Sequence, residues 1–175
     1  MAQYYIYLIS SLPALLFPGK PPFSVEQFLE RCQGLIPESD MAVITSIMKE
    51  EELQGSKAEI LSHWQRIDAA LRNELVKIRS ARLKIDPYKY LRQPLTFDSY
   101  LAGVATGASR NTSPLDAERA MDQARWSAIE ELLIGHYFDF EVLAGYALKL
   151  KILLRWENIL KSDKLRNLKE ITHVN

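Results

Sequence analysis

The chain has 175 residues, of which 47% are hydrophobic and 25% are charged, and its 22 basic residues balance 22 acidic ones. This length suits one ordinary domain, and the apolar content argues against wholesale disorder. Zero net charge provides no overall field to attract nucleic acid or an anionic membrane, although a local patch could still do so, and neutral partners are expected. The single cysteine, Cys32, suits a reducing compartment, which we expect to be the cytoplasm.

The beginning of the chain is its most apolar part. The apolar stretch from Tyr4 to Phe17 is interrupted by Ser10, Ser11 and Pro13, and it is shorter than the ~20 residues that a membrane-spanning helix needs. It also lacks the basic start and the cleavage site of a secretory signal. Residues 4–9 are too few to show a decisive period, so this segment is either a short extended strand or a helical turn.

Two short helices are predicted next. Ser24 and Gln27 have the spacing of a capping box, which opens a helix that ends near Gly34. A second helix begins after Pro37 and places three apolar side chains on one side, Met41, Ile44 and Met48.

A long helix should follow, from a second capping box at Ser56 and Glu59 to about Lys84. Its apolar residues recur at spacings of three and four: Ile60, Trp64, Ile67, Leu71, Leu75 and Ile78. The far half of this helix is basic, but its cations flank the stripe on both sides instead of forming one face. They are interpreted as solvated charges and not as a nucleic-acid surface.

The pair Asp86-Pro87 ends the long helix. The residues from there to Thr112 include Gly103, Gly107 and Asn111, a composition that favours turns, and we expect a loop from Gly103 to Ser113.

Two further helices are predicted to form an antiparallel hairpin. The first begins at Ser113-Pro114, a cap followed by proline, and ends near Gly135. The second runs from about Asp139 to Lys161, after which Ser162 could cap a last polar helix. Its inner face is expected to contain Leu143, Tyr146, Ala147, Leu150, Leu153, Leu154 and Leu160. The predicted fold is therefore all-α, an elongated helical bundle with a long hairpin, in one domain over residues 1–175.

No catalytic, cofactor or metal site is evident. The chain has no phosphate-binding glycine pattern, and its histidines at 63, 136 and 173 are too far apart for a typical zinc pair. His136 and Asp139 are assigned to a helix end, and Cys32 is interpreted as a buried small residue.

Glu157 is the most informative charge, because it shares a helical face with Leu150, Leu153, Leu154 and Leu160. Burial there would require a partner. That partner is either an arginine of a neighbouring helix, in a structural ion pair, or a group on another subunit. Arg155 and Lys149 lie close by on the same predicted helix and are included in this candidate site.

Several strings resemble a small bacterial family encoded among V-type ATPase subunits. These strings are Tyr4–Leu8 (YYIYL), Ser11–Pro13 (SLP), Glu118–Trp126 (ERAMDQARW), Tyr137–Phe140 (YFDF) and Tyr146–Trp156 (YALKLKILLRW). They more distantly resemble the C subunit of V-type and archaeal-type ATPases, called d in eukaryotes, a helical protein that seats the central stalk on the membrane rotor ring.

Within the C-subunit pattern, four residues match in part: Tyr146, Lys149, Ile152 and Arg155. Leu150 and Lys151 stand where that family has acidic residues, and this chain is about half as long. The resemblance implies a non-catalytic subunit or accessory protein that couples the central stalk to the rotor, with ATPase subunits as partners and no cofactor. The alternative is a stand-alone helical adaptor or regulator of one protein partner; an enzyme would need a site that is not evident.

Overall fold

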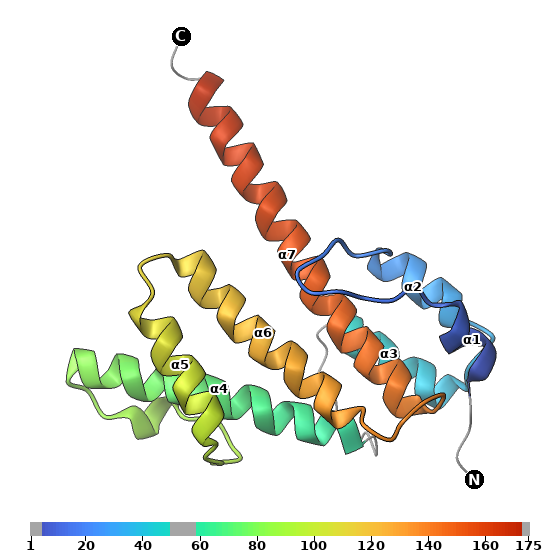
Figure 1. The fold of residues 1–175 in the computed structure, drawn as a ribbon, viewed down its shortest axis with the longest axis horizontal. Helices are drawn as coiled ribbons and strands as arrows, with labels where there is room; N and C mark the ends of the chain where they lie inside the picture. The colour runs from blue at the N-terminus through green and yellow to red at the C-terminus, as the bar shows by residue number, and fades with distance from the viewer. Residues whose placement is uncertain (1–4, 50–58, 173–175) are drawn as a thin grey trace. The chain divides into compact units, whose positions relative to one another are not determined.

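The computed structural model describes residues 5–49 and 59–172, which form seven α-helices and one 3-10 helix and no strand (Figure 1). The all-α prediction is confirmed. The contacts divide these residues into two compact units, one containing residues 5–49 and 136–172 and the other residues 59–135. We name them the α7 unit and the α4 unit. A single domain over residues 1–175 stays a prediction, because a division of contacts does not measure whether the parts fold separately.

The α7 unit contains α1 (Ile6–Ser11), α2 (Val25–Cys32), α3 (Glu38–Lys49) and α7 (Phe140–Thr172), and α3 packs against both α2 and α7. The predicted capping box is confirmed: the Ser24 hydroxyl accepts from the Gln27 amide at 3.2 Å, and the Gln27 side chain accepts from the Ser24 amide at 3.0 Å. Phe28 and Cys32, one helical turn apart on α2, are completely buried. The cap therefore sets the start of a helix whose inner face completes this core.

A helix begins at the second described residue, Ile6. Residues Ile6–Ser11 form one short helix with Leu8 buried, and the Ser11 hydroxyl donates to the Leu8 carbonyl at 2.7 Å. The extended alternative is wrong for these residues, because a helical turn satisfies its own backbone groups while a strand needs a neighbour. Tyr4 lies outside the described residues.

Helix α7 is longer than predicted. It continues to Thr172, because no glycine or proline interrupts residues 146–172. The predicted new cap at Ser162 is wrong: its hydroxyl donates to the Asn158 carbonyl at 2.9 Å inside the same helix. On the predicted inner face Leu143, Leu150 and Leu153 are buried, whereas Leu160 is exposed.

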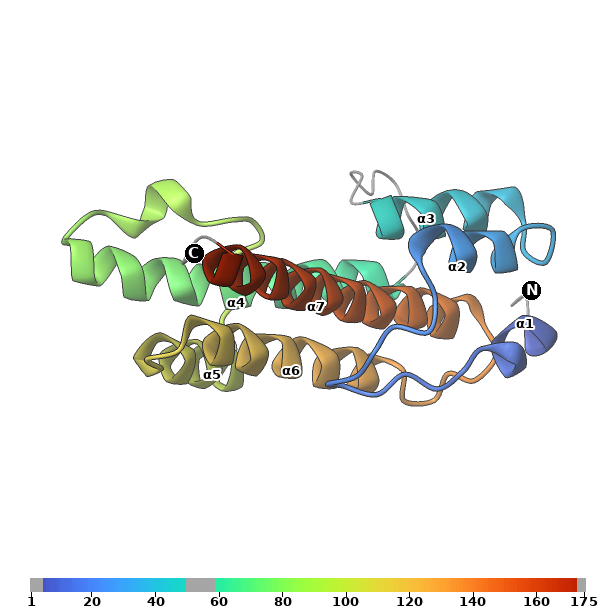
Figure 2. The same cartoon turned by 90° about the horizontal axis from the view of Figure 1, so that it is seen from above.

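The α4 unit contains α4 (Glu59–Leu83), the 3-10 helix η1 (Pro87–Tyr90), α5 (Ser99–Arg110) and α6 (Pro114–Leu132). Helices α4, α5 and α6 pack against one another, and η1 lies against α4 (Figure 2). The predicted stripe on α4 is confirmed where Ile67, Leu71, Leu75 and Ile78 join one core cluster with α5 and α6. The capping box predicted at Ser56 lies outside the described residues.

The predicted loop from Gly103 to Ser113 is wrong over most of its length, because Ser99–Arg110 forms α5. Asp98 caps this helix by accepting from the Leu101 amide at 3.0 Å. Leu101, Ala105 and Ala108 recur at helical spacing and are buried against α4 and α6, whereas Gly103 and Gly107 are exposed. Burial of the apolar side offsets the cost of two glycines, about 1 kcal/mol each relative to alanine.

This arrangement predicts that Gly103→Ala and Gly107→Ala each stabilise the protein by about 0.5–1 kcal/mol. A Cβ at either position would meet no atom within 4 Å. Urea unfolding measures the change. Gly135→Ala is the matched control, because Gly135 has a φ of 90°, where alanine is strained, and the same change should destabilise. Destabilisation by the α5 substitutions would contradict this account of the helix.

The start of α6 is as predicted: the Ser113 hydroxyl accepts from the Asp116 amide at 3.2 Å, and Pro114 is the first helical residue. The expected hairpin pairing of α6 with α7 stays a prediction, because the two helices belong to different units. Within its own unit, α6 packs against α4 and α5, and α7 packs against α3. Among the helices of residues 5–49 and 59–172, none combines the length and the apolarity that crossing a bilayer requires.

Candidate interaction surfaces

Glu157 is not the buried charge that its helical face predicts. Its side chain remains 37% exposed and pairs with Lys161, one turn later on α7, at 3.1 Å. Glu157 therefore pairs with a lysine of its own helix and not with the expected arginine of a neighbouring helix. The apolar face of α7 is buried at Trp156, whereas Leu160 is 47% exposed, so burial of this face decreases around Glu157.

Arg155 is exposed and Lys149 is half-buried. They lie on the same helix as Glu157, but no ion pair joins either of them to it. A contact of these three residues with another subunit stays a prediction.

Loss of one partner of a buried ion pair typically costs about 3–5 kcal/mol, but the partial exposure of Glu157 lowers the loss expected for Glu157→Ala. A partly exposed pair of this spacing contributes about 0.3–0.5 kcal/mol. Chemical denaturation of Glu157→Ala should therefore show a loss within about 0.5 kcal/mol. A loss of several kcal/mol in the isolated protein would show that Glu157 has a stronger partner than Lys161.

Four of the five strings that resemble the ATPase-associated family meet inside the α7 unit. The Tyr5 amide donates to the Phe138 carbonyl, and the Tyr146 hydroxyl donates to the Pro13 carbonyl at 3.0 Å. Burial raises the pKa of Tyr146 to about 12, partly opposed by the nearby Arg31, so this phenol remains a donor at neutral pH. These hydrogen bonds join segments that are more than a hundred residues apart in the chain.

Two tyrosines close to the hydrogen bond between Tyr5 and Phe138 are exposed. Tyr7 on α1 is 77% exposed and Tyr137, before α7, is 74% exposed, and each lies within two residues of the hydrogen bond between Tyr5 and Phe138. Tyrosine combines a large apolar ring with a polar end, and it is enriched where proteins contact one another. We name Tyr7 and Tyr137 the tyrosine pair.

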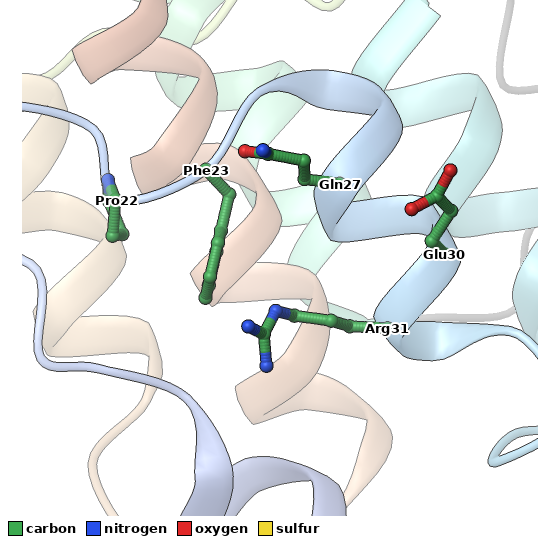
Figure 3. A pocket seen from close by; sticks show the side chains of 5 residues that line it. All are labelled: Pro22, Phe23, Gln27, Glu30 and Arg31. Atoms are coloured by element: carbon green, nitrogen blue, oxygen red, sulfur yellow. The ribbon is translucent and has the colours of Figure 1, made fainter.

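An open pocket in the α7 unit lies between the connector before α2 and α2 itself (Figure 3). Five residues line it: Pro22, Phe23, Gln27, Glu30 and Arg31. The Arg31 guanidinium lies 4.4 Å from the centre of the Phe23 ring, a cation–π contact that orients both side chains. The lining therefore combines a carboxylate, an amide and a guanidinium with an aromatic ring.

Cys32 lies in the core, and His136 and Asp139 lie at the start of α7. Cys32 is completely buried, and burial raises the pKa of its thiol to about 11, so it is a poor nucleophile at neutral pH. Asp139 accepts from the Val142 amide at 3.2 Å and contacts the His136 ring at 2.6 Å, as expected for groups at a helix start. Among residues 5–49 and 59–172, no three histidine, cysteine or acidic side chains are placed to hold a metal ion.

The α4 unit carries a second candidate surface, which sequence reasoning missed. We name the segment Leu83–Tyr100 the aromatic loop; it runs from the last residue of α4, through η1, to the first two residues of α5. Helix α4 ends where Lys84 adopts a left-handed φ of 55° and the Ile85 amide bonds the Ser80 carbonyl at 3.1 Å. The sequence signal for this surface is the concentration of tyrosine and phenylalanine between the two helices, whereas the composition of the stretch by itself indicates only turns.

A buried asparagine holds the aromatic loop. The Asn73 side chain on α4 is 2% exposed; it donates to the Arg92 carbonyl and accepts from the Arg92 amide, both at 2.8 Å. An amide side chain can imitate a backbone pairing in this way, with both of its polar atoms satisfied. The loop is therefore anchored to α4 at its middle, although nearly all of its residues are exposed.

Asn73→Ala should destabilise the protein by about 1–3 kcal/mol, because both backbone groups of Arg92 lose their partner. Trypsin cleavage after Lys89 and Arg92 should become faster as the loop is released. Gln93→Ala is the control, since Gln93 is exposed and bonds only the nearby Leu95 amide. Equal stability and equal cleavage for the two variants would exclude an anchoring role for Asn73.

Comparison of the chain with protein-family models, with curated proteins and with solved structures found no match.

Proposed function

We propose that this protein is a non-catalytic subunit or accessory protein of a V-type ATPase or ATP synthase, and that it helps couple the central stalk to the membrane rotor during ATP-linked ion transport. The observation that carries the proposal is the meeting of four family-like strings in the α7 unit, through the Tyr5–Phe138 and Tyr146–Pro13 hydrogen bonds. Separate sequence strings that resemble the same family support that resemblance more strongly when they pack together in one unit of the structure. In this function the chemistry belongs to the partners, and the chain itself needs no cofactor.

The tyrosine pair is the surface that we assign to the ATPase contact. Tyr7 and Tyr137 belong to two of the resembling strings, and both are exposed although neighbouring residues of those strings, such as Leu8, are buried. Exposed rings on a supported backbone can anchor a protein interface at low entropic cost.

Co-purification from the cell of origin tests the proposal. Tagged protein is expected to retain central-stalk and rotor-ring subunits of the ATPase, and Tyr7→Ala with Tyr137→Ala is expected to reduce this recovery at least about tenfold, as loss of two anchors should. Tyr88→Ala with Phe97→Ala is the matched control, because these rings are similarly exposed but lie in the α4 unit. Failure to recover any ATPase subunit while the intact complex is present in the extract would reject the assignment.

The alternative is a stand-alone adaptor or regulator that binds one protein partner, and the same exposed tyrosine pair favours it. The two functions differ in what the tagged protein retains. Recovery of one protein outside the ATPase, lost in the Tyr7→Ala and Tyr137→Ala variant, would establish the adaptor. Unchanged recovery of the ATPase by that variant would instead place the contact elsewhere on the chain.

A further inference from the structure

The aromatic loop exposes an unusual amount of apolar surface. About half of the large apolar side chains that the described residues expose lie within it: Leu83, Ile85, Tyr88, Tyr90, Leu95, Phe97 and Tyr100. Tyr88 is 75% exposed and Phe97 is 73% exposed. Concentrations of this kind mark surfaces that contact a partner or a membrane.

Positive charge accompanies these side chains. Lys84, Lys89 and Arg92 are exposed, and no ion pair joins them to a carboxylate of the described residues. The two acids of the loop are engaged by the backbone: Asp86 accepts from the Tyr88 amide at 3.0 Å, and Asp98 accepts from the Leu101 amide. The loop therefore presents unpaired cations next to exposed apolar side chains. This combination is complementary to a surface with an anionic outer layer over an apolar inner layer.

An anionic lipid surface fits this combination better than a nucleic acid or an acidic protein. Stacking with bases uses aromatic rings, but Leu83, Ile85 and Leu95 are aliphatic and would gain nothing from it. A protein partner would need pockets that match an irregular row of side chains, whereas the boundary between lipid headgroups and acyl chains adapts to them. Tyrosine rings with flanking lysine and arginine are favoured at that boundary.

We propose that the aromatic loop docks this protein on an anionic lipid surface. Its apolar side chains enter the boundary between headgroups and acyl chains, and Lys84, Lys89 and Arg92 contact the lipid phosphates. Asn73 keeps the loop on α4, so docking requires little further ordering of the chain. The inference is independent of the ATPase assignment, since it uses residues of the α4 unit and none of the resembling strings.

Co-sedimentation of the full-length protein with vesicles tests the proposal. Binding is expected to equimolar phosphatidylcholine and phosphatidylglycerol vesicles at low salt, and it should weaken as salt is raised and on pure phosphatidylcholine. Replacing all three cations (Lys84→Gln, Lys89→Gln, Arg92→Gln) should lower the partition coefficient roughly 100-fold. Tyr88→Ala with Phe97→Ala should lower it about tenfold or more, because two exposed rings no longer enter the bilayer.

Two control variants keep composition and exposure comparable. Tyr7→Ala with Tyr137→Ala removes two rings of similar exposure from the α7 unit and should bind vesicles normally. Lys20→Gln, Lys49→Gln and Lys161→Gln together remove the same number of exposed charges from the α7 unit and should reduce binding by less than about threefold. Circular dichroism establishes that every variant is folded.

Absence of vesicle binding by the wild-type protein would overturn the proposal. Equal losses in the loop variants and in their controls would overturn it too, because binding would then reflect general charge or apolarity. Binding to a labelled single-stranded oligonucleotide without binding to anionic vesicles would assign the loop to nucleic acid instead. None of these results bears on recovery of ATPase subunits, so failure of this proposal and failure of the proposed function are distinguishable.

Discussion

Replacing Arg125 with alanine is expected to lower the free energy of unfolding by about 3–5 kcal/mol, the largest effect that we predict in the α4 unit. Arg125 on α6 is almost completely buried; it contacts Asp122 at 2.9 Å and reaches Asp68 on α4 at 3.0 Å. Asp122 is only 1% exposed, so without the guanidinium its charge would lose its ion pair with Arg125 in a place that water hardly reaches. Urea unfolding followed by circular dichroism provides the measurement.

Arg72→Ala is the matched control for Arg125→Ala. Arg72 also pairs with Asp68, at 2.7 Å, but its side chain is 48% exposed, and loss of such a pair should cost less than about 1 kcal/mol. Both arginines pair with Asp68, so the difference between the two variants reports the buried position of Arg125 together with its pair with Asp122. Similar losses in the two variants would show that the Asp122–Arg125 pair has no special importance.

Phe28→Ala is expected to cost about 3–5 kcal/mol in the α7 unit, since it removes a completely buried ring and leaves a cavity. The Phe28 ring is stacked on Tyr146 with centroids 5.5 Å apart, and this pair joins α2 to α7. Denaturant unfolding should show the loss, and the environment of Tyr146 should change in near-ultraviolet circular dichroism.

Phe97→Ala removes an identical side chain from an exposed position and should change stability by less than about 0.5 kcal/mol. Phe28→Leu should recover much of the loss of Phe28→Ala, because it fills most of the cavity. A small effect of Phe28→Ala would mean that α2 contributes little to the core of the α7 unit.

Local signals were sufficient for most helix starts. The caps at Ser24 and Ser113 act between residues three positions apart, so they could be recognised without knowledge of any other part of the chain. The stripe from Ile67 to Ile78 likewise follows from the helical period alone. Helix ends were less certain: α7 passes Lys161 because no residue there stops it.

Helix α5 shows where local signals were insufficient. Gly103 and Gly107 weaken an isolated helix, and a composition rule therefore indicated a loop. The spacing of Leu101, Ala105 and Ala108 on the opposite side was available in the sequence, but its importance depends on α4 and α6 being present to cover it. Tertiary packing outweighs propensity at this helix.

The candidate surfaces were predicted least well. Glu157 is expected to be buried because its helical face is apolar, yet its side chain is 37% exposed and the following Leu160 is 47% exposed. Asp122 and Arg125 were part of a string noted only for its resemblance, and their burial was not foreseen, because nothing local distinguishes them from solvated charges on α6. The tyrosines of the aromatic loop are evident in the sequence, but the attachment of the loop to α4 depends on the pairing of Asn73 with Arg92.

The sequence by itself determined the helical class, the caps and the apolar stripes, because each depends on residues within one or two turns of one another. Only the tertiary structure decided which helices pack together, which charges are buried and which rings remain exposed. These outcomes depend on contacts between residues far apart in the chain, such as Asp68 with Arg125, Tyr146 with Pro13 and Asn73 with Arg92. The helical period of the sequence cannot reveal such contacts, because each forms only when the rest of the fold brings its two residues together.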